Sequence, residues 1–236
     1  MIILGIDSAS ISCSAAIYKS EKVVKNTTES FINNGLTHSQ TLLPMISEVL
    51  VQAKITAKDI DLIAITKGPG AFTGLRIGMA TAKGIAAPFD TPCVCVSTLE
   101  AIAHTACEHH NGVFCAVMDA RCNQVYNALF EMCDGDLVRL CEDRAITIPD
   151  LENELKTLDK PIILCGDGTA VCEKNFSEVK YTIADEEVRL PHAGNVCMLG
   201  KKYKNEAQSP DKISPVYLRL PQASRELLKN KKENQK

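Results

Sequence analysis

Two apolar segments that each end on an aspartate constrain the fold of this chain most. Residues 2–6 are apolar and lead to Asp7, and residues 113–118 are apolar and lead to Asp119. Short apolar runs of this length are typical of buried strands. Each is followed by further strand-like segments and then by helices, so a similar order of elements occurs twice. The sequence therefore predicts an α/β fold with two lobes.

The boundary between the lobes is predicted between residues 105 and 112, in a polar stretch. The first lobe would then cover residues 1–108 and the second residues 109–222, and the last part of the second could return to the first. Residues 223–236 are rich in Lys, Asn, Gln and Glu and have no apolar stripe, so we expect a disordered tail.

The charge of the chain argues against a protein that holds RNA alone. Its 236 residues carry a formal net charge of −3, and the isoelectric point is about 6.0. Neutralisation of phosphates by basic side chains usually supplies most of the affinity for nucleic acid. We therefore expect any contact with RNA to depend on a partner.

The cysteines and the N-terminal segment indicate a cytoplasmic protein. The eleven cysteines include no Cys-x-x-Cys pair, so we expect free thiols in a reducing compartment and no metal site built from them. Residues 1–7 reach an acidic side chain too early for a signal peptide. No apolar run is long enough to span a bilayer, so no membrane association is expected.

A glycine-rich segment at residues 68–78 has two interpretations. The first is a weak phosphate or nucleotide site made by Asp7, Ser8, Gly68 and Gly70, because glycines can expose backbone amides at the start of a helix. The second is that the glycines allow close packing of a helix, while the polar residues organise a turn. No Gly-Lys-Ser/Thr sequence closes the segment, so it is not a Walker loop.

Two predicted helices, at residues 37–53 and 74–87, carry more apolar surface than one core face requires. A helix that is apolar nearly all round is either deeply buried or covered by another chain. We expect a partner interface here, although the second lobe could also cover these helices. The predicted interface residues are Leu42, Met45, Val49, Leu75, Arg76, Met79, Lys83 and Ala86.

Residues 119–121 (Asp-Ala-Arg) follow the second apolar strand. An aspartate and an arginine at this spacing could bind an anion or form a hinge. They could equally form an internal ion pair in the second lobe. The sequence leaves these alternatives open.

Several motifs resemble those of the TsaB (YeaZ) family of tRNA threonylcarbamoyladenosine biosynthesis proteins, in the Gcp-like (glycoprotease) superfamily. The most specific is the glycine-rich segment at residues 65–78. Further matches cover nearly the whole chain in order, at residues 6–9, 37–40, 42–44, 119–121, 125–126, 166–168 and 215–219.

The resemblance implies a two-lobed fold of the actin, Hsp70 and sugar-kinase type, related to ribonuclease H. It also implies a heterodimer with the catalytic paralogue TsaD through the helices of the first lobe, and recruitment of the ATPase TsaE. This complex adds threonylcarbamoyl to the adenosine beside the anticodon of ANN-decoding tRNAs. The chain would meet tRNA only through the complex and could form a homodimer when alone.

One departure from the catalytic paralogue indicates a non-catalytic subunit. The paralogue carries a His-x-x-x-His metal pair, and the matching positions here are Thr98 and Ile102. Ile102 cannot bind a metal, so no metal, no catalytic residue and no cofactor are expected, apart from weak binding of ATP or ADP with Mg²⁺ at the complex interface.

Two other functions stay open for a chain of this fold. A nucleotide-dependent phosphotransferase would have Asp7, Asp119 and Asp167 as its only candidate carboxylates. A metallopeptidase would need a bound metal.

Overall fold

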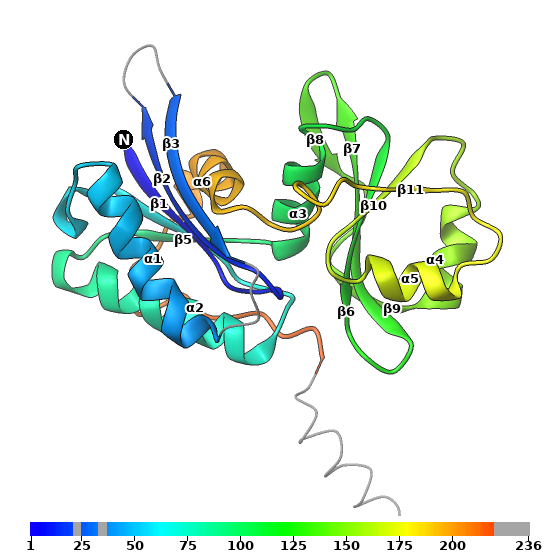
Figure 1. The fold of residues 1–236 in the computed structure, drawn as a ribbon, viewed down its shortest axis with the longest axis horizontal. Coiled ribbons are helices and arrows are strands. Elements are labelled where there is room, and N and C mark those ends of the chain that lie inside the picture. The colour runs from blue at the N-terminus through cyan, green and yellow to red at the C-terminus, as the bar shows by residue number, and fades with distance from the viewer. Residues whose placement is uncertain (21–24, 33–36, 220–236) are drawn as a thin grey trace, which may run out of the picture.

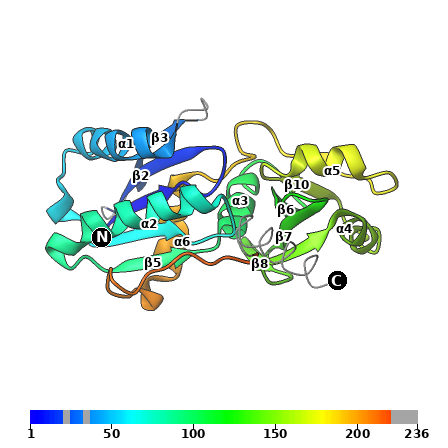
Figure 2. The ribbon, with the colours of Figure 1, turned by 90° about the horizontal axis from the view of Figure 1, so that it is seen from below.

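The computed structural model describes residues 1–20, 25–32 and 37–219 and consists of two lobes that lie side by side (Figures 1 and 2). Each lobe is built around a mixed β-sheet with helices on both faces. The predicted two-lobed α/β fold is therefore confirmed. The predicted disordered tail at residues 223–236 lies outside the described residues.

The sheet of the first lobe has five strands in the order β3-β2-β1-β4-β5. Strand β1 lies in the centre, antiparallel to β2 and parallel to β4, and is covered on both faces, which explains its apolar sequence. The strands are β1 (Ile2–Asp7), β2 (Cys13–Ser20), β3 (Lys25–Ile32), β4 (Leu62–Thr66) and β5 (Cys93–Val96).

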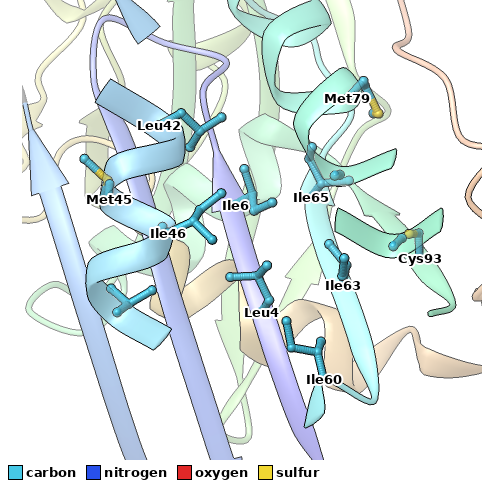
Figure 3. Packing of buried hydrophobic residues seen from close by; sticks show 14 of the residues in the cluster. Leu4, Ile6, Leu42, Met45, Ile46, Ile60, Ile63, Ile65, Met79 and Cys93 are labelled. Carbon is cyan, nitrogen blue, oxygen red and sulfur yellow. The ribbon is translucent and has the colours of Figure 1, made fainter. Parts of the chain in front are cut away.

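Helices cover both faces of this sheet. Helices α1 (His38–Gln52) and α2 (Phe72–Ala86) pack on one face, and α6 (Ala193–Lys202) packs on the other. Figure 3 shows Ile46 of α1 beside Ile6 of the central strand, and Met79 of α2 on the side of Ile65 of β4, all in one buried cluster. Short 3-10 helices lie at Ala57–Asp59, Ala87–Phe89 and Lys204–Glu206.

The second lobe has a six-stranded sheet in the order β11-β10-β6-β7-β8, and β9 pairs with β7. Helix α3 packs on one face, and α4 and α5 lie on the other. The elements are α3 (Thr98–Ala106), β6 (Val113–Asp119), β7 (Gln124–Cys133), β8 (Asp136–Arg139), β9 (Arg144–Thr147), α4 (Ile148–Leu155), β10 (Ile162–Cys165), α5 (Thr169–Asn175) and β11 (Thr182–Ile183).

The boundary between the lobes differs from the predicted one at helix α3. The predicted boundary puts α3 in the first lobe, but Leu99 and Ile102 pack against Phe114 in the core of the second. The error arises because an amphipathic pattern identifies a helix but not the sheet that it covers. The prediction allows the last segment to return to the first lobe, and Val196 of α6 does pack against Ile3 there.

The first lobe is consequently discontinuous in sequence. It consists of residues 1–97 and a returning segment, residues 193–219, which pairs backbone to backbone with β5 at Gln208 and Cys93. The second lobe is one continuous stretch inserted between these two parts. None of the described helices is long and apolar enough to cross a membrane.

Candidate functional site

The side chains predicted to form a partner interface are mostly buried within the first lobe itself. Only Arg76 is exposed, and Lys83 is half-buried. The apolar stripe of each helix faces the sheet of its own lobe. The apolar positions of the predicted set therefore offer no surface to another chain, and the prediction is corrected for them. The six buried residues, each at most 3% exposed, are Leu42, Met45, Val49, Leu75, Met79 and Ala86.

The opposite face of the same helices is exposed and carries few charges. Leu43 and Val51 of α1 are 56% and 75% exposed, and Ala80 and Gly84 of α2 are also exposed. Exposed apolar side chains gathered on neighbouring helices mark candidate protein interfaces. We call this surface, defined by Leu43, Val51, Ala80 and Gly84, the outer helix face.

The glycines of residues 68–78 bring α2 into direct contact with the turn after β1. A Cβ atom at Gly74 would lie 2.1 Å from the carbonyl oxygen of Ser8, and one at Gly78 would lie 2.3 Å from its hydroxyl. The Ser8 hydroxyl donates a 3.0 Å hydrogen bond to the carbonyl of Gly74. At these positions the structure favours the interpretation of close packing.

Asp7 is fully buried at the end of β1, beneath this contact. Its Oδ1 accepts hydrogen bonds from the Thr66 hydroxyl (2.7 Å) and the Ala9 amide (3.3 Å), whereas Oδ2 has no hydrogen-bond partner among the described residues. Burial in a poorly polarisable environment raises the pKa of this carboxyl from 3.8 to about 7. Asp7 therefore acts inside the fold rather than as an accessible ligand.

A cavity of about 410 Å³ opens where the two lobes meet. Of the four residues predicted to bind phosphate, only Gly70 lines it. Asp7 and Ser8 are buried, and the space beside Gly68 is filled by the carbonyl of Val216. The cavity combines aromatic and charged side chains, namely Phe72, Asp119, Arg121, Tyr126, Asp167, Tyr217 and Arg219.

A second cavity, of about 950 Å³, lies beside the first and shares Ile11 and Asp167 with it. Its wall is acidic, with Asp185, Glu186 and Glu187 on the segment that leads to α6. Burial raises the pKa of Asp167 to about 6, although a hydrogen bond from the Asp119 backbone opposes this rise.

The returning segment ends in a strap, residues 213–219, that runs from the first lobe towards the second (Figures 1 and 2). The Tyr217 ring stacks on Phe72, at the start of α2, with 4.5 Å between centroids. The Arg76 guanidinium lies 3.9 Å over the Phe72 ring and donates a 3.1 Å hydrogen bond to the Tyr217 hydroxyl. The strap is thereby fixed to the end of α2.

The far end of the strap contacts the β6–β7 turn of the second lobe. The Arg219 guanidinium donates to the carbonyls of Ala120 and Arg121. Residues 121–123 all have a positive φ, and Asp119 Oδ1 accepts the Arg121 amide at 2.7 Å. The side chains of Asp119 and Arg121 also form a 3.6 Å ion pair, one of the alternatives left open by the sequence.

The sequence does not predict the contact made by Arg219. Residues 215–219 stand out in the sequence only as part of the family resemblance. A single arginine near a chain end gives no local signal of the distant carbonyls that it will meet.

The two positions that match the metal-binding histidines of the catalytic paralogue are both buried in α3. Ile102 lies in the core of the second lobe, and Thr98 is also fully buried. Of the candidate carboxylates of the phosphotransferase alternative, Asp167 interacts electrostatically with both Asp7 and Asp119. Within residues 1–20, 25–32 and 37–219, no three His, Cys, Asp or Glu side chains are arranged to hold a metal ion.

The two sheets, their flanking helices and the cavity between them define a protein of the actin, Hsp70 and sugar-kinase class. Residues 33–228 match the family model of TsaD, tRNA N6-adenosine threonylcarbamoyltransferase, so the chain is a member of that superfamily. Within it, the chain belongs to the TsaB (YeaZ) family, as the resemblance predicted.

Relatives of this family match over nearly their whole length. The TsaB protein of Haemophilus influenzae is 36% identical, over 93% of this chain and 94% of the relative. The TsaB protein of Escherichia coli is 30% identical, over 93% and 95%. A crystal structure of an uncharacterized Pseudomonas aeruginosa protein, described as similar to peptidase YeaZ, superposes with a TM-score of 0.80 at 25% identity, over 92% of this chain and 99% of that one.

Proposed function

We propose that this chain is the non-catalytic partner subunit of a complex that adds threonylcarbamoyl to the adenosine beside the anticodon of ANN-decoding tRNAs. It pairs with a catalytic TsaD subunit and works with a TsaE ATPase in the cytoplasm, and it meets tRNA within that complex. The whole-length likeness to proteins named for tRNA threonylcarbamoyladenosine biosynthesis is the observation that carries this proposal.

The non-catalytic role that we propose for this subunit is supported by two residues of α3. Ile102 packs in an apolar core, and Thr98 is equally enclosed, so neither is available as a metal ligand in this fold. The catalytic centre then belongs to the partner subunit. Any ATP or ADP with Mg²⁺ binds weakly and at the complex interface.

The outer helix face is the surface that we assign to the catalytic partner. Leu43 and Val51 supply exposed apolar area, and Ala80 and Gly84 leave room for close approach of another helix. The two predicted helices thus remain the proposed interface, but through their solvent-facing side chains instead of the buried ones. In the absence of the partner, the same face would support a homodimer.

Co-expression with the TsaD homologue of the same genome, followed by size-exclusion chromatography, tests this function. We expect a one-to-one complex that modifies tRNA only when both chains are present. Val51→Glu should abolish the complex while the circular dichroism spectrum stays native, because Val51 is 75% exposed.

The matched control is Val138→Glu, on β8 of the second lobe, where Val138 is 43% exposed. It introduces the same charge away from the outer helix face and should leave the complex intact. Separate elution of the two wild-type chains, with ATP turnover by this chain alone, would instead support the phosphotransferase.

A further inference from the structure

The two lobes are joined on one side by polar contacts between helices α3 and α6, which lie next to each other (Figures 1 and 2). The buried amide of Asn195, on α6, donates hydrogen bonds to Thr105 (3.2 Å) and Glu108 (2.9 Å) at the C-terminal end of α3. Near the start of α3, Glu100 accepts a 2.6 Å hydrogen bond from the Tyr203 hydroxyl. The chain also passes from lobe to lobe directly before each of these helices. This side of the junction is therefore connected both by the backbone and by buried side chains.

The other side of the junction contains the cavities of about 410 and 950 Å³. Ile11, at the tip of the turn between β1 and β2, lines both cavities and is 59% exposed. Asp167 of the second lobe also lines both, and its carboxyl group accepts a hydrogen bond from the Ile11 backbone. Space of this size takes the place of the packed side chains that hold a protein interior together. The closure of this side therefore depends on individual polar contacts.

The strap crosses this second side and is anchored in the first lobe along most of its length. Ile213 lies in the core of that lobe, 1% exposed. The Val216 amide donates a 2.7 Å hydrogen bond to the carbonyl of Lys67. The Tyr217 ring follows, stacked on Phe72. Up to Tyr217 the strap therefore moves with the first lobe.

Two residues further on, Arg219 reaches the second lobe. Its guanidinium donates to the carbonyls of Ala120 and Arg121, and hydrogen bonds from a charged donor are stronger than those between neutral groups. Residues 121–123 have a left-handed backbone, a conformation that persists only where the surrounding contacts hold it. Arg219 adds to the contacts within the second lobe that hold this turn, and it ties the turn to the first lobe.

We propose that the strap is a clasp, in which Arg219 keeps the two lobes closed over the cavities. When Arg219 releases the β6–β7 turn, the lobes open about the contact between α3 and α6, which acts as the hinge. Opening breaks the hydrogen bond between Asp167 and Ile11 and gives access to the side chains that line the cavity of about 410 Å³, among them Tyr126. The clasp belongs to the chain itself and is independent of the function proposed above.

Amide hydrogen exchange on the full-length chain, followed by NMR residue by residue, tests the clasp. The Ile11 amide is the reporter, because its hydrogen bond to Asp167 joins the two lobes. In Arg219→Ala this amide should exchange about tenfold faster, since a hydrogen bond from a charged group contributes about this factor or more. Small-angle X-ray scattering should give a larger radius of gyration for the same variant.

A second variant removes the anchor of the strap and leaves Arg219 in place. Tyr217→Ala loses the stacking on Phe72 and the 3.1 Å hydrogen bond from Arg76. Tyr217 is 38% exposed, so the fold should tolerate its loss. We expect faster exchange of the Ile11 amide and a larger radius of gyration here too, because a clasp needs both of its ends.

The matched control is Arg189→Ala. Arg189 donates a 3.0 Å hydrogen bond to the carbonyl of Ala184, which belongs to the same lobe. The variant therefore loses an arginine–carbonyl contact that does not join the lobes. The Ile11 amide should exchange at the wild-type rate, and the radius of gyration should not change.

The alternative is that Arg219 only stabilises the turn that it touches. In that case the amides of residues 121–124 exchange faster in Arg219→Ala, while the Ile11 amide on the other side of the cavity keeps its wild-type rate. That result would overturn the proposal. It would also be overturned if the radius of gyration stayed at the wild-type value in both Arg219→Ala and Tyr217→Ala.

Discussion

Strands β1 and β6 both end on an aspartate, yet the two strand ends have opposite environments. Asp7 is fully buried because α2 packs directly on the turn that follows it. Asp119 is partly exposed, and its turn contacts the strap and, through the Asn123 carbonyl, the first residue of α4. The same short sequence pattern therefore gives a buried acid in one lobe and a surface ion pair in the other. What decides the outcome is the element that packs on top.

The largest expected effect comes from disturbing the helix that covers the first strand end. Met79 of α2 is 3% exposed and packs with Ile6 and Ile65. Met79→Glu should cost at least about 5 kcal/mol, because it buries an unpaired carboxylate. We expect an unfolded or insoluble protein by circular dichroism.

The neighbouring substitution Ala80→Glu is the control for that prediction. Ala80 points to solvent on the same helix, so this variant should fold normally and lose only the partner. A folded Met79→Glu protein would mean that α2 does not seal the first strand end.

The next effect concerns the pH dependence of stability. The pKa of Asp7 is 3.8 when unperturbed and about 7 in the fold. The folded state therefore binds the proton more tightly, and stability falls as pH rises between about 4 and 7. A difference of about three units corresponds to about 4 kcal/mol.

Asp7→Asn removes this ionisation and should be more stable than the wild type at pH 8. Its stability should fall less between pH 4 and pH 8, as measured by urea denaturation at a series of pH values. A smaller fall should remain, because the pKa of Asp167 is also raised, to about 6. Parallel pH curves for wild type and variant would contradict the buried environment of Asp7.

A smaller effect is expected from Gly74→Ala. The added methyl group would lie 2.1 Å from the backbone oxygen of Ser8, so helix and turn must separate. Overpacking of this kind costs about 1–3 kcal/mol. Gly84→Ala on the same helix meets nothing within 4 Å and should stabilise by about 0.5–1 kcal/mol, because alanine favours a helix. Thermal unfolding of the two variants should give shifts of opposite sign.

The smallest effect is expected at the second strand end. Asp119→Ala removes the acceptor of the Arg121 amide, but water can replace it at this partly exposed turn. We expect a decrease of about 1 kcal/mol in the free energy of unfolding, measured by urea denaturation. A decrease as large as that of a buried site would show that the two strand ends are more alike than their burial indicates.

The sequence predicts the two lobes and the main helices because these depend on local apolar pattern. It places the start of the first long helix at Thr37, and α1 starts directly after it, at His38. The pattern does not show whether the apolar stripe that contains Met79 and Leu42 is covered by the sheet of its own lobe or by another chain. That depends on strand pairing between residues distant in sequence, as does the place of α3 and α6. The cavity escapes prediction for the same reason, since it joins Phe72, Arg121 and Arg219 from three parts of the chain.

The discontinuity of the first lobe has a consequence for how the protein is made. The ribosome synthesises the chain from its N-terminus, and domains generally fold as units during synthesis. The second lobe becomes complete before α6 and the strap exist, whereas Ile3 and Ala64 of the first sheet must await Val196 to cover them. The lobe that begins first is therefore finished last. Its uncovered sheet face is the part of the nascent protein most in need of protection.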